Sequence, residues 1–346
     1  MKPAIRQHHF GTLTDKTPVN LYCLTNSNGI ELEVLDYGGI IRRIGLPDRE
    51  GRVQNCVLSF EELLDYETKS PYFGALIGRY GNRIAKGRFT LNDVEYRVAQ
   101  NQGEHHLHGG EKGFDKVLWK VEEVTTVEGV GLDLSYVSPH MEEGYPGTLS
   151  LKVRYFLTHQ NTLKVEYYAI TDRPTVLNLT QHSYFNLSGN PMQDCLNHEL
   201  SINANHFLAV DKTMIPTGEK VAVQQTPFDF THPRTIGKAM ALSHEQLELG
   251  QGFDHCYCFN PKETGLKQVA ELVDPSSGRK MQVATTAPGM QLYTANHLSS
   301  PFVPYGAVCL ETQAYPNSPN QKDFPSTVLT PEEVFQSTTH FHFSID

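Results

Sequence analysis

A histidine set among polar and aromatic residues is the part of this sequence best suited to chemistry. His182 lies in residues 178–187, Asn-Leu-Thr-Gln-His-Ser-Tyr-Phe-Asn-Leu, which we expect to be an extended, strand-like run. Imidazole exchanges protons near neutral pH, amides and hydroxyls hydrogen-bond sugar hydroxyls, and aromatic rings cover the apolar face of a pyranose. The composition indicates a sugar site. A histidine in a strand is more often structural, so the hypothesis requires partners elsewhere.

Glu311 is the second candidate, because an apolar strand, Val308-Cys309-Leu310, runs directly into it before a proline-rich turn. A carboxylate in such a position costs stability unless it has a partner. Partial desolvation would raise its pKa from about 4.3 towards neutrality and make it a better general base. For the isolated segment, a glutamate paired with a neighbouring cation at a strand end is the alternative.

Three further segments offer polar groups next to glycine or aromatic residues. Asn82 and Arg83 lie in a glycine-rich bend, His108 precedes two glycines, and Asp254 follows Phe253. A guanidinium can bridge adjacent hydroxyls, and a carboxylate beside a ring suits both the hydroxyl edge and the apolar face of a sugar. A solvated loop, a histidine that caps backbone groups and an ordinary turn are the respective alternatives.

Metal binding is not predicted. His106 and His108 share a face if residues 105–108 form a strand, and this spacing resembles the metal motif of the cupins. In that motif a glutamate follows after three or four residues, whereas here only two glycines separate His108 from Glu111. No fitting downstream histidine is apparent, and the alternating Cys256 and Cys258 do not make a zinc site by themselves.

Composition excludes several classes of protein. The chain has 346 residues without a break in composition, so we expect a single domain over 1–346. The net charge of −10 and the lack of a basic block argue against nucleic acid or anionic lipid as a partner. The six cysteines are scattered, the N-terminus lacks the apolar core of a signal peptide, and no stretch is long enough to span a bilayer. A cytoplasmic protein is expected.

Short alternating segments separated by turns predict an all-β fold. Residues 30–35 alternate, 151–157 and 163–170 flank a turn, and 269–273 meets 281–284 across Asp-Pro-Ser-Ser-Gly. Helical patterns are confined to 60–66 and 236–249. The rhythm of a doubly wound fold is absent, so a large antiparallel β-sandwich with a few short helices fits best.

Together these segments resemble the aldose 1-epimerases, or galactose mutarotases. The strongest signature of that family is Asn-x-Thr-Asn-His-x-Tyr-Phe-Asn-Leu, and residues 178–187 match it except at Gln181, which retains the amide with one methylene more. Seven further motifs follow in family order over nearly the whole chain: Asn82-Arg83, 107–110, 114–116, 143–147, 253–255, 288–293 and 310–313.

The resemblance implies a β-sandwich of the galactose mutarotase type that binds a free aldose in an open cleft without a metal or organic cofactor. It implies His182 as proton donor and Glu311 as proton acceptor in acid/base opening and reclosure of the hemiacetal ring, which interconverts the α and β anomers of sugars such as galactose and glucose. Arg79 and His255 are expected to be structural. The sugar-holding residues implied are Asn82, Arg83, His108, Tyr184, Asp254 and Gln291.

Two other classes stay open at this point. A glycoside hydrolase would pair Asp254 with Glu311 at roughly 5–10 Å across a glycosidic bond. A sugar-binding module would keep the aromatic and amide residues without needing an acid and a base. The preferred aldose, and whether the chain is a monomer or a homodimer, cannot be predicted from the sequence.

Overall fold

Apolar and polar residues alternate along the longest strands, and this alternation decides which face of the main sheet is buried. In the computed structural model, which describes residues 2–346, strand β13 (Leu149–Thr158) buries Leu149 and Leu151 and exposes Lys152. The residues paired with them on the neighbouring strands point to the same sides of the sheet. The sheet therefore has one apolar face and one polar face.

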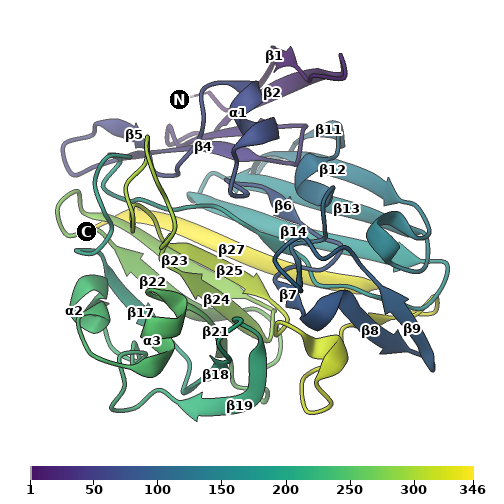
Figure 1. Cartoon of the computed structure of the whole chain (residues 1–346). Coiled ribbons are helices and arrows are strands. Elements are labelled where there is room, and N and C mark those ends of the chain that lie inside the picture. The colour runs from purple at the N-terminus through teal and green to yellow at the C-terminus, as the bar shows by residue number, and fades with distance from the viewer. Residues whose placement is uncertain (1) are drawn as a thin grey trace.

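Nine antiparallel strands form this main sheet, and β27 runs through its middle (Figure 1). Across the sheet the strands are β11 (Lys120–Thr125), β12 (Gly129–Ser138), β13, β14 (Thr162–Thr171), β27 (Phe335–Ile345), β23 (Arg279–Thr285), β22 (Lys267–Val273), β17 (Glu199–Ile202) and β20 (Arg234–Thr235).

Two five-stranded sheets pack on the apolar face. One buried cluster contains Leu32 and Leu292 from these two sheets together with Phe341 of β27. The first sheet is β1 (Ala4–Thr12), β2 (Pro18–Thr25), β3 (Glu31–Leu35), β4 (Ile41–Pro47) and β5 (Val53–Asn55). The second, here the C-terminal sheet, has the order β19 (Pro216–Ala222), β18 (His206–Val210), β21 (Asp254–Cys258), β24 (Gly289–Tyr293) and β25 (Cys309–Gln313). This arrangement confirms the predicted antiparallel sandwich.

Short elements connect the sheets. Four pairs of short strands are β6 (Leu76–Ile77) with β16 (Thr180–Gln181), β7 (Arg83–Ile84) with β10 (His106–Leu107), β8 (Arg88–Leu91) with β9 (Val94–Arg97), and β15 (Thr175–Val176) with β26 (Val328–Leu329). The α-helices are α1 (Leu63–Thr68), α2 (Ile236–Met240) and α3 (Glu245–Gly250), and single 3₁₀ turns occupy Ala85–Gly87, Phe114–Lys116, Glu142–Gly144 and Ser318–Asn320. Within residues 2–346, none of the helices has the length and apolar character needed to cross a bilayer.

The predicted hairpins are confirmed, whereas two predicted elements differ from the structure. β13 pairs with β14, and β22 pairs with β23, across the predicted turns. The helix expected over 236–249 is interrupted and forms α2 and α3. The strand-like run expected over 178–187 is wrong as a continuous strand: only Thr180–Gln181 is regular, and Asn178 and Phe185 make isolated bridges. His182 therefore lies in an irregular segment.

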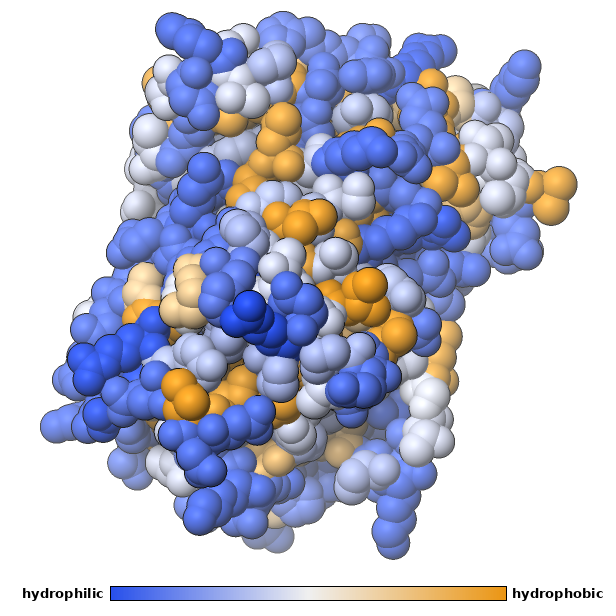
Figure 2. Space-filling view, turned by 90° about the vertical axis from the view of Figure 1, so that its right-hand side faces the viewer, coloured by the Kyte–Doolittle hydropathy of each residue, from blue (hydrophilic) through white to orange (hydrophobic). Residues whose placement is uncertain are grey.

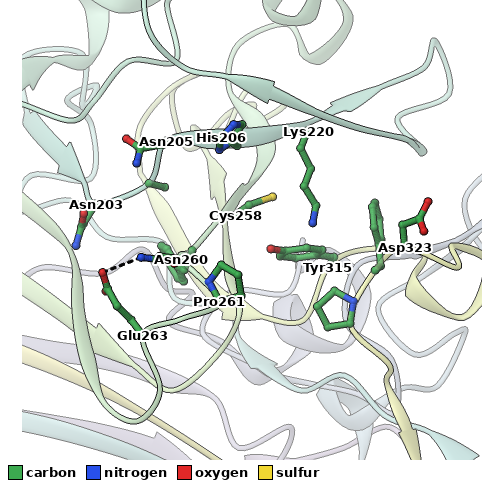
Figure 3. Close-up of a pocket in the computed structure, with 14 residues that line it drawn as sticks. Asn203, Asn205, His206, Lys220, Cys258, Asn260, Pro261, Glu263, Tyr315 and Asp323 are labelled. Atoms are coloured by element: carbon green, nitrogen blue, oxygen red, sulfur yellow. Dashed lines mark hydrogen bonds between the residues drawn. The ribbon is translucent and has the colours of Figure 1, made fainter.

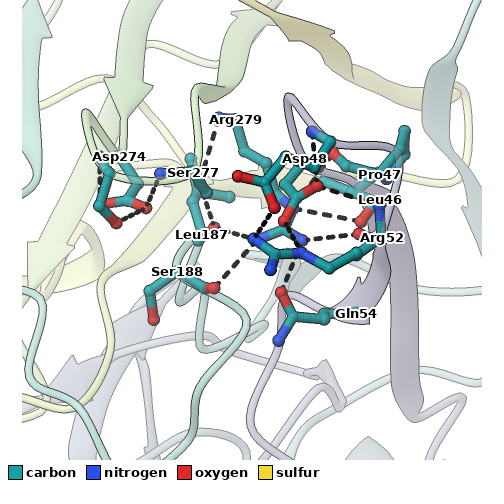
Figure 4. Close-up of polar contacts among 12 residues, drawn as sticks. Leu46, Pro47, Asp48, Arg52, Gln54, Leu187, Ser188, Asp274, Ser277 and Arg279 are labelled. Carbon is teal, nitrogen blue, oxygen red and sulfur yellow. Dashed lines mark hydrogen bonds and ion pairs between the residues drawn. The ribbon is translucent and has the colours of Figure 1, made fainter.

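Arg279, at the start of β23, ties three parts of the fold together (Figure 4). It is fully buried, and its guanidinium donates hydrogen bonds of 2.9–3.2 Å to six oxygens. These are the carbonyls of Leu46, Pro47, Arg52, Leu187 and Ser188 and the side-chain oxygen of Gln54. Because Arg279 carries five N–H donors in a rigid fork, one side chain can hold the β4–β5 hairpin and the 187–188 segment on the main sheet.

The surface in Figure 2 is mostly hydrophilic, with hydrophobic residues in small separate groups. Apolar side chains that are at least 40% exposed include Val137, Tyr168 and Ile170, which lie on β12 and β14 of the main sheet. Together with Leu118 they line one depression on this face, so these apolar side chains form a single patch.

Candidate active site

The outer face of the C-terminal sheet carries the predicted acidic residues. On β25, Leu310 belongs to the core between the sheets, so the alternation of the strand directs Glu311 to the opposite face. Gln291 of β24 is paired with Glu311 on one side and with Cys256 of β21 on the other. Asp254, at the start of β21, lies two residues before Cys256 and so shares the same face. Three neighbouring strands therefore present one polar patch.

A pocket of about 220 Å³ lies over this patch. Segments between residues 71 and 184 form its other walls, so residues far apart in sequence meet there. Of the predicted site residues, Asn82, Arg83, His108, His182, Tyr184, Asp254 and Glu311 line the pocket. Gln291 is buried just behind Asp254, to whose Oδ1 its amide donates a hydrogen bond of 2.6 Å.

His182 and Glu311 face each other as an acid–base pair. His182 Nε2 lies 3.7 Å from Glu311 Oε2, and both side chains are no more than 4% exposed. Burial lowers the pKa of His182 to about 4, and a hydrogen bond with its own backbone and the charge of Asp254 oppose this shift. Burial, reinforced by Asp254, raises the pKa of Glu311 well above its usual value, and Arg83 opposes this shift. Desolvation thus disfavours the charged form of each group.

Arg83 is held in the pocket by two partners. Its Nε donates to Gln102 Oε1 at 2.8 Å, and its Nη2 lies 3.4 Å from Asp254 Oδ2. Since Gln291 binds the other oxygen of Asp254, both carboxylate oxygens are engaged. The guanidinium and the carboxylate are therefore fixed in place before a ligand arrives, and their remaining donor and acceptor positions can meet sugar hydroxyls.

His108 is oriented as a hydrogen-bond donor. The backbone N–H of Asn82 donates to His108 Nδ1 at 3.1 Å, and the backbone N–H of His108 donates to the Asn82 carbonyl. Burial, together with the nearby His182, lowers the pKa of His108 well below its usual value. A neutral imidazole that accepts at Nδ1 carries its proton on Nε2. His108 thus offers an N–H to the pocket.

The tautomer of His108, with its proton on Nε2, argues against a metal in the pocket. Ligand atoms of His108, His182 and Glu311 lie within 4.8 Å of one another, a spacing at which a cation could be held. A metal needs the lone pair of a histidine nitrogen, and on His108 the backbone donor occupies one nitrogen and the proton the other. The expected pairing of His106 with His108 on one strand face is wrong, because β10 ends at Leu107 and His108 has a φ of +51°.

His106, Arg79 and His255 lie outside the pocket. His106 Nδ1 bonds to the Ala99 carbonyl, and Tyr145 bonds to its Nε2. The Arg79 guanidinium donates to backbone carbonyls such as that of Pro146. His255 accepts the backbone N–H of Asp254 at Nδ1. Each is buried and bound to backbone or to a structural side chain.

The pocket is also lined by four polar or aromatic residues that were not predicted from the sequence: Tyr72, Gln102, Tyr293 and His297. Tyr293 could have been found, because it lies two residues after Gln291 on β24 and so shares its face. Tyr72 and Gln102 come from irregular segments, where residue spacing does not determine side-chain direction.

A larger pocket of about 630 Å³ lies near β18, β19 and the end of β21 (Figure 3). Its titratable side chains include His206, Lys220, Glu263 and Asp323, and all four are solvent-exposed. The Lys220 ammonium lies 5.3 Å from the centre of the Tyr315 ring. Because water screens these charges, this pocket lacks the desolvated acid–base pair of the smaller one.

Comparison with known proteins gives the family. The family model described as aldose 1-epimerase matches residues 20–342. The chain belongs to the aldose 1-epimerase family. A galactose mutarotase of Sus scrofa is 43% identical over 328 residues, which cover 92% of each chain. An aldose 1-epimerase of Escherichia coli is 31% identical over 338 residues, which cover 95% of this chain and 96% of that one. The crystal structure of a galactose 1-epimerase from Lactobacillus acidophilus superposes with a TM-score of 0.89 at 27% identity over 99% of each chain.

This aldose 1-epimerase is thus an isomerase with a sugar substrate, and the structural match confirms the fold. The residue that departs from the family signature, Gln181, is hydrogen-bonded at both ends of its amide. Its Nε2 donates to the Gly74 carbonyl at 2.8 Å, and its Oε1 accepts the backbone N–H of Ser183 at 2.9 Å. The additional methylene is accommodated by linking the irregular segment around His182 to the segment that contains Gly74.

Proposed function

We propose that His182 and Glu311 are the acid and base with which this chain interconverts the α and β anomers of free aldohexoses such as galactose and glucose. The observation that carries the assignment is the distance of 3.7 Å between His182 Nε2 and Glu311 Oε2. Ring opening acts on two oxygens bonded to the same carbon, the C1 hydroxyl and the ring oxygen. An acid and a base at this separation can reach both oxygens.

In the forward step, the Glu311 carboxylate removes the proton of the C1 hydroxyl while the His182 imidazolium protonates the ring oxygen. The bond between C1 and the ring oxygen breaks, and C1 becomes an aldehyde. Rotation about the C1–C2 bond presents the other face of the carbonyl, and the reversed proton transfers close the ring. Each group contributes on the order of 10²–10⁴ in rate.

The proton balance of the pair fits this cycle. The pair has two protonation states with the same number of protons and the same net charge. In one state a neutral imidazole faces a carboxylic acid, and in the other an imidazolium faces a carboxylate. Burial favours the neutral arrangement, whereas Arg83 favours the carboxylate and Asp254 favours the imidazolium. We therefore expect kcat/KM to follow a bell-shaped pH profile whose two limbs belong to the pair.

The remaining polar groups hold the sugar. Arg83 and the Nε2–H of His108 are placed to donate to hydroxyls and to stabilise the developing charge. Asp254 and Asn82 are placed to accept and donate in the same pocket, and Tyr184 supplies an aromatic wall. Gln291 positions Asp254.

A glycoside hydrolase is less well supported by this geometry. Both oxygens of Asp254 are engaged by Arg83 and Gln291, and the partner that Glu311 faces is His182. A retaining or inverting hydrolase needs its second carboxylate free to act as a nucleophile or to activate water.

Polarimetry on freshly dissolved pure anomers tests the proposal. We expect the chain to accelerate the change in optical rotation of α-galactose and α-glucose, and the ratio of the two kcat/KM values gives the preferred aldose. Binding without acceleration would indicate a sugar-binding module, and release of monosaccharide from a disaccharide would indicate a hydrolase.

The cytoplasm is the compartment that we propose for this enzyme, as a monomer or a homodimer. All six cysteines are free, which fits a reducing compartment.

A further inference from the structure

Two tyrosine rings lie nearly parallel to the His182 imidazole. The ring of Tyr184 is 4.9 Å from it, centre to centre, with an angle of 8° between the planes. The ring of Tyr72 is 6.0 Å from it at an angle of 12°, and it also meets His108 edge-on at 4.7 Å. Tyr72 lines the pocket but belongs to none of the motifs from which the site was predicted.

Four hydrogen bonds fix the segment that carries Tyr72 to the segment that carries His182. The backbone N–H of Gly74 donates to the His182 carbonyl, and the backbone N–H of His182 donates to the Ala75 carbonyl, both at 2.9 Å. The Tyr184 hydroxyl donates to the Pro71 carbonyl at 2.9 Å, and Gln181 donates to the Gly74 carbonyl. The ring of Tyr72 is therefore held in register with the imidazole.

The backbone at Tyr72 supports a specific role for this placement. Its φ is +68°, in the left-handed region that bulky side chains rarely adopt. Residues kept in such a conformation are concentrated at functional sites, where the surrounding structure imposes it.

The hydrogen bond that raises the pKa of His182 comes from its own backbone. Among residues 2–346, no other residue hydrogen-bonds to its Nδ1, whereas in many catalytic histidines a carboxylate binds that atom. The groups that face the ring are Glu311 at Nε2, His108 edge-on, the two tyrosine rings, and the charges of Asp254 and Arg83 within the pocket. Aromatic faces attract a cation at such distances.

We propose that Tyr72 is a positioning residue of the mutarotation reaction, whose ring holds the His182 imidazole in place and stabilises the imidazolium through its π face. The inference rests on the proposed function, because it requires His182 to be the acid. Tyr72 acts through His182 and needs no contact with the sugar. Its hydroxyl is not required for this role, so the ring alone carries the effect.

Two substitutions separate the ring from the hydroxyl. Tyr72→Leu removes the π face and leaves a shorter apolar side chain, so we expect the imidazolium to lose stability and kcat to fall about five- to tenfold, while KM changes less than about twofold. Tyr72→Phe keeps the ring, and we expect kcat within about twofold of wild type. Tyr72→Met provides a second protein without the ring if the leucine variant does not fold.

The direct readout is the titration of His182 by NMR in the unliganded full-length protein labelled at histidine. We expect the pKa of His182 to fall in the leucine variant and to stay at the wild-type value in the phenylalanine variant. Tyr293→Leu is the matched control: it removes a tyrosine that lines the same pocket but is stacked on neither histidine, so the pKa of His182 should not move.

An unchanged pKa and an unchanged kcat in Tyr72→Leu would overturn the proposal, and so would an equal loss in Tyr72→Phe. His182→Asn distinguishes this failure from failure of the proposed function. If that variant kept wild-type mutarotation, His182 would not be the acid. If it lost mutarotation while Tyr72→Leu behaved as wild type, only the role of Tyr72 would be refuted.

Discussion

At the scale of single residues, the proposed catalysis depends on one proton shared by two buried groups. His182 Nε2 and Glu311 Oε2 lie 3.7 Å apart, while Asp254 favours the charged form of His182 and Arg83 favours that of Glu311. The pair can therefore change from neutral to ionic without a change in net charge. This lowers the cost of holding an acid and a base in a desolvated pocket.

Glu311→Gln should abolish the base while keeping the shape of the side chain. We expect kcat to fall by at least about 10²-fold and galactose to bind within about tenfold, or about 1.4 kcal/mol, of wild type. Polarimetry gives kcat and calorimetry gives the affinity, after circular dichroism has established folding.

Glu332→Gln, at an exposed position, is the control for this substitution. Near-wild-type mutarotation by Glu311→Gln would remove Glu311 as the base and make Asp254 the next carboxylate to test. Arg83→Ala should differ from Glu311→Gln by weakening binding as well as turnover, since contacts to hydroxyls act in the ground state too.

Chelation should leave activity unchanged. The donor tautomer of His108 opposes metal binding by His108, His182 and Glu311, and none of the proposed steps uses a Lewis acid. Activity after dialysis against EDTA, compared with activity after addition of zinc or manganese, checks this expectation. Loss on chelation and recovery with either metal would show that a cation takes part.

At the scale of elements, the site combines a regular sheet with irregular segments, and this division explains what the sequence could predict. The two hairpins were predicted correctly because their strands alternate, whereas Gln291, which shares the face of Glu311, was selected only through the family resemblance. The segments around Tyr72 and His182 have no repeating period, so spacing gave a strand where the structure has bends. His108 was selected for its place before two glycines and again through the family resemblance, but its orientation depends on a hydrogen bond from the Asn82 backbone that no local pattern reveals.

Among the contacts between elements, those of Arg279 should lower the free energy of unfolding most when they are lost. Arg279→Leu would leave up to six buried oxygens without their donor, so we expect the free energy of unfolding to fall by about 3–5 kcal/mol. Denaturant titration measures the change, and mutarotation of the protein that remains folded should persist, because Arg279 lies outside the active-site pocket.

Arg52→Gln is the control for Arg279, since the Arg52 side chain is 68% exposed. It pairs with Glu50, which is exposed, and with the buried Asp48, whose Oδ1 also accepts the backbone N–H groups of Glu50 and Arg52. We expect no measurable change in its denaturation midpoint. Equal stability of the two variants would contradict a structural role for the buried guanidinium.

At the scale of the whole molecule, buried neutral histidines should make the fold sensitive to acid. Burial lowers the pKa of His106, His182, His198 and His255 to about 4 in the folded chain. Their pKa in the unfolded chain is about 6.5, so the unfolded chain binds more protons between these values. Their contribution to stability is complete above about pH 6.5 and is lost as the pH falls towards 4. Asp115, whose pKa burial raises to about 6, acts in the opposite direction.

Each of these histidines contributes up to about 3 kcal/mol, so we expect the free energy of unfolding to fall by several kcal/mol between pH 7.5 and pH 5. Denaturant titrations at a series of pH values measure the slope. His198→Gln should flatten the slope, whereas His8→Gln, at an exposed position, should not. A slope of zero over this range would contradict the burial of neutral imidazoles.

The central position of β27 has a consequence for how the chain is made. Every strand that pairs with it precedes it in the sequence, and β14, one of its two neighbours, ends at Thr171. During synthesis β14 therefore keeps an unpaired edge until residues 335–345 emerge, a delay of roughly 10–30 s at ordinary rates of translation. An exposed strand edge is a template for aggregation, so the nascent chain needs protection from other chains over this interval. We expect the yield of folded protein to depend strongly on chaperone supply and growth temperature. The stability of the finished enzyme alone would not predict this dependence.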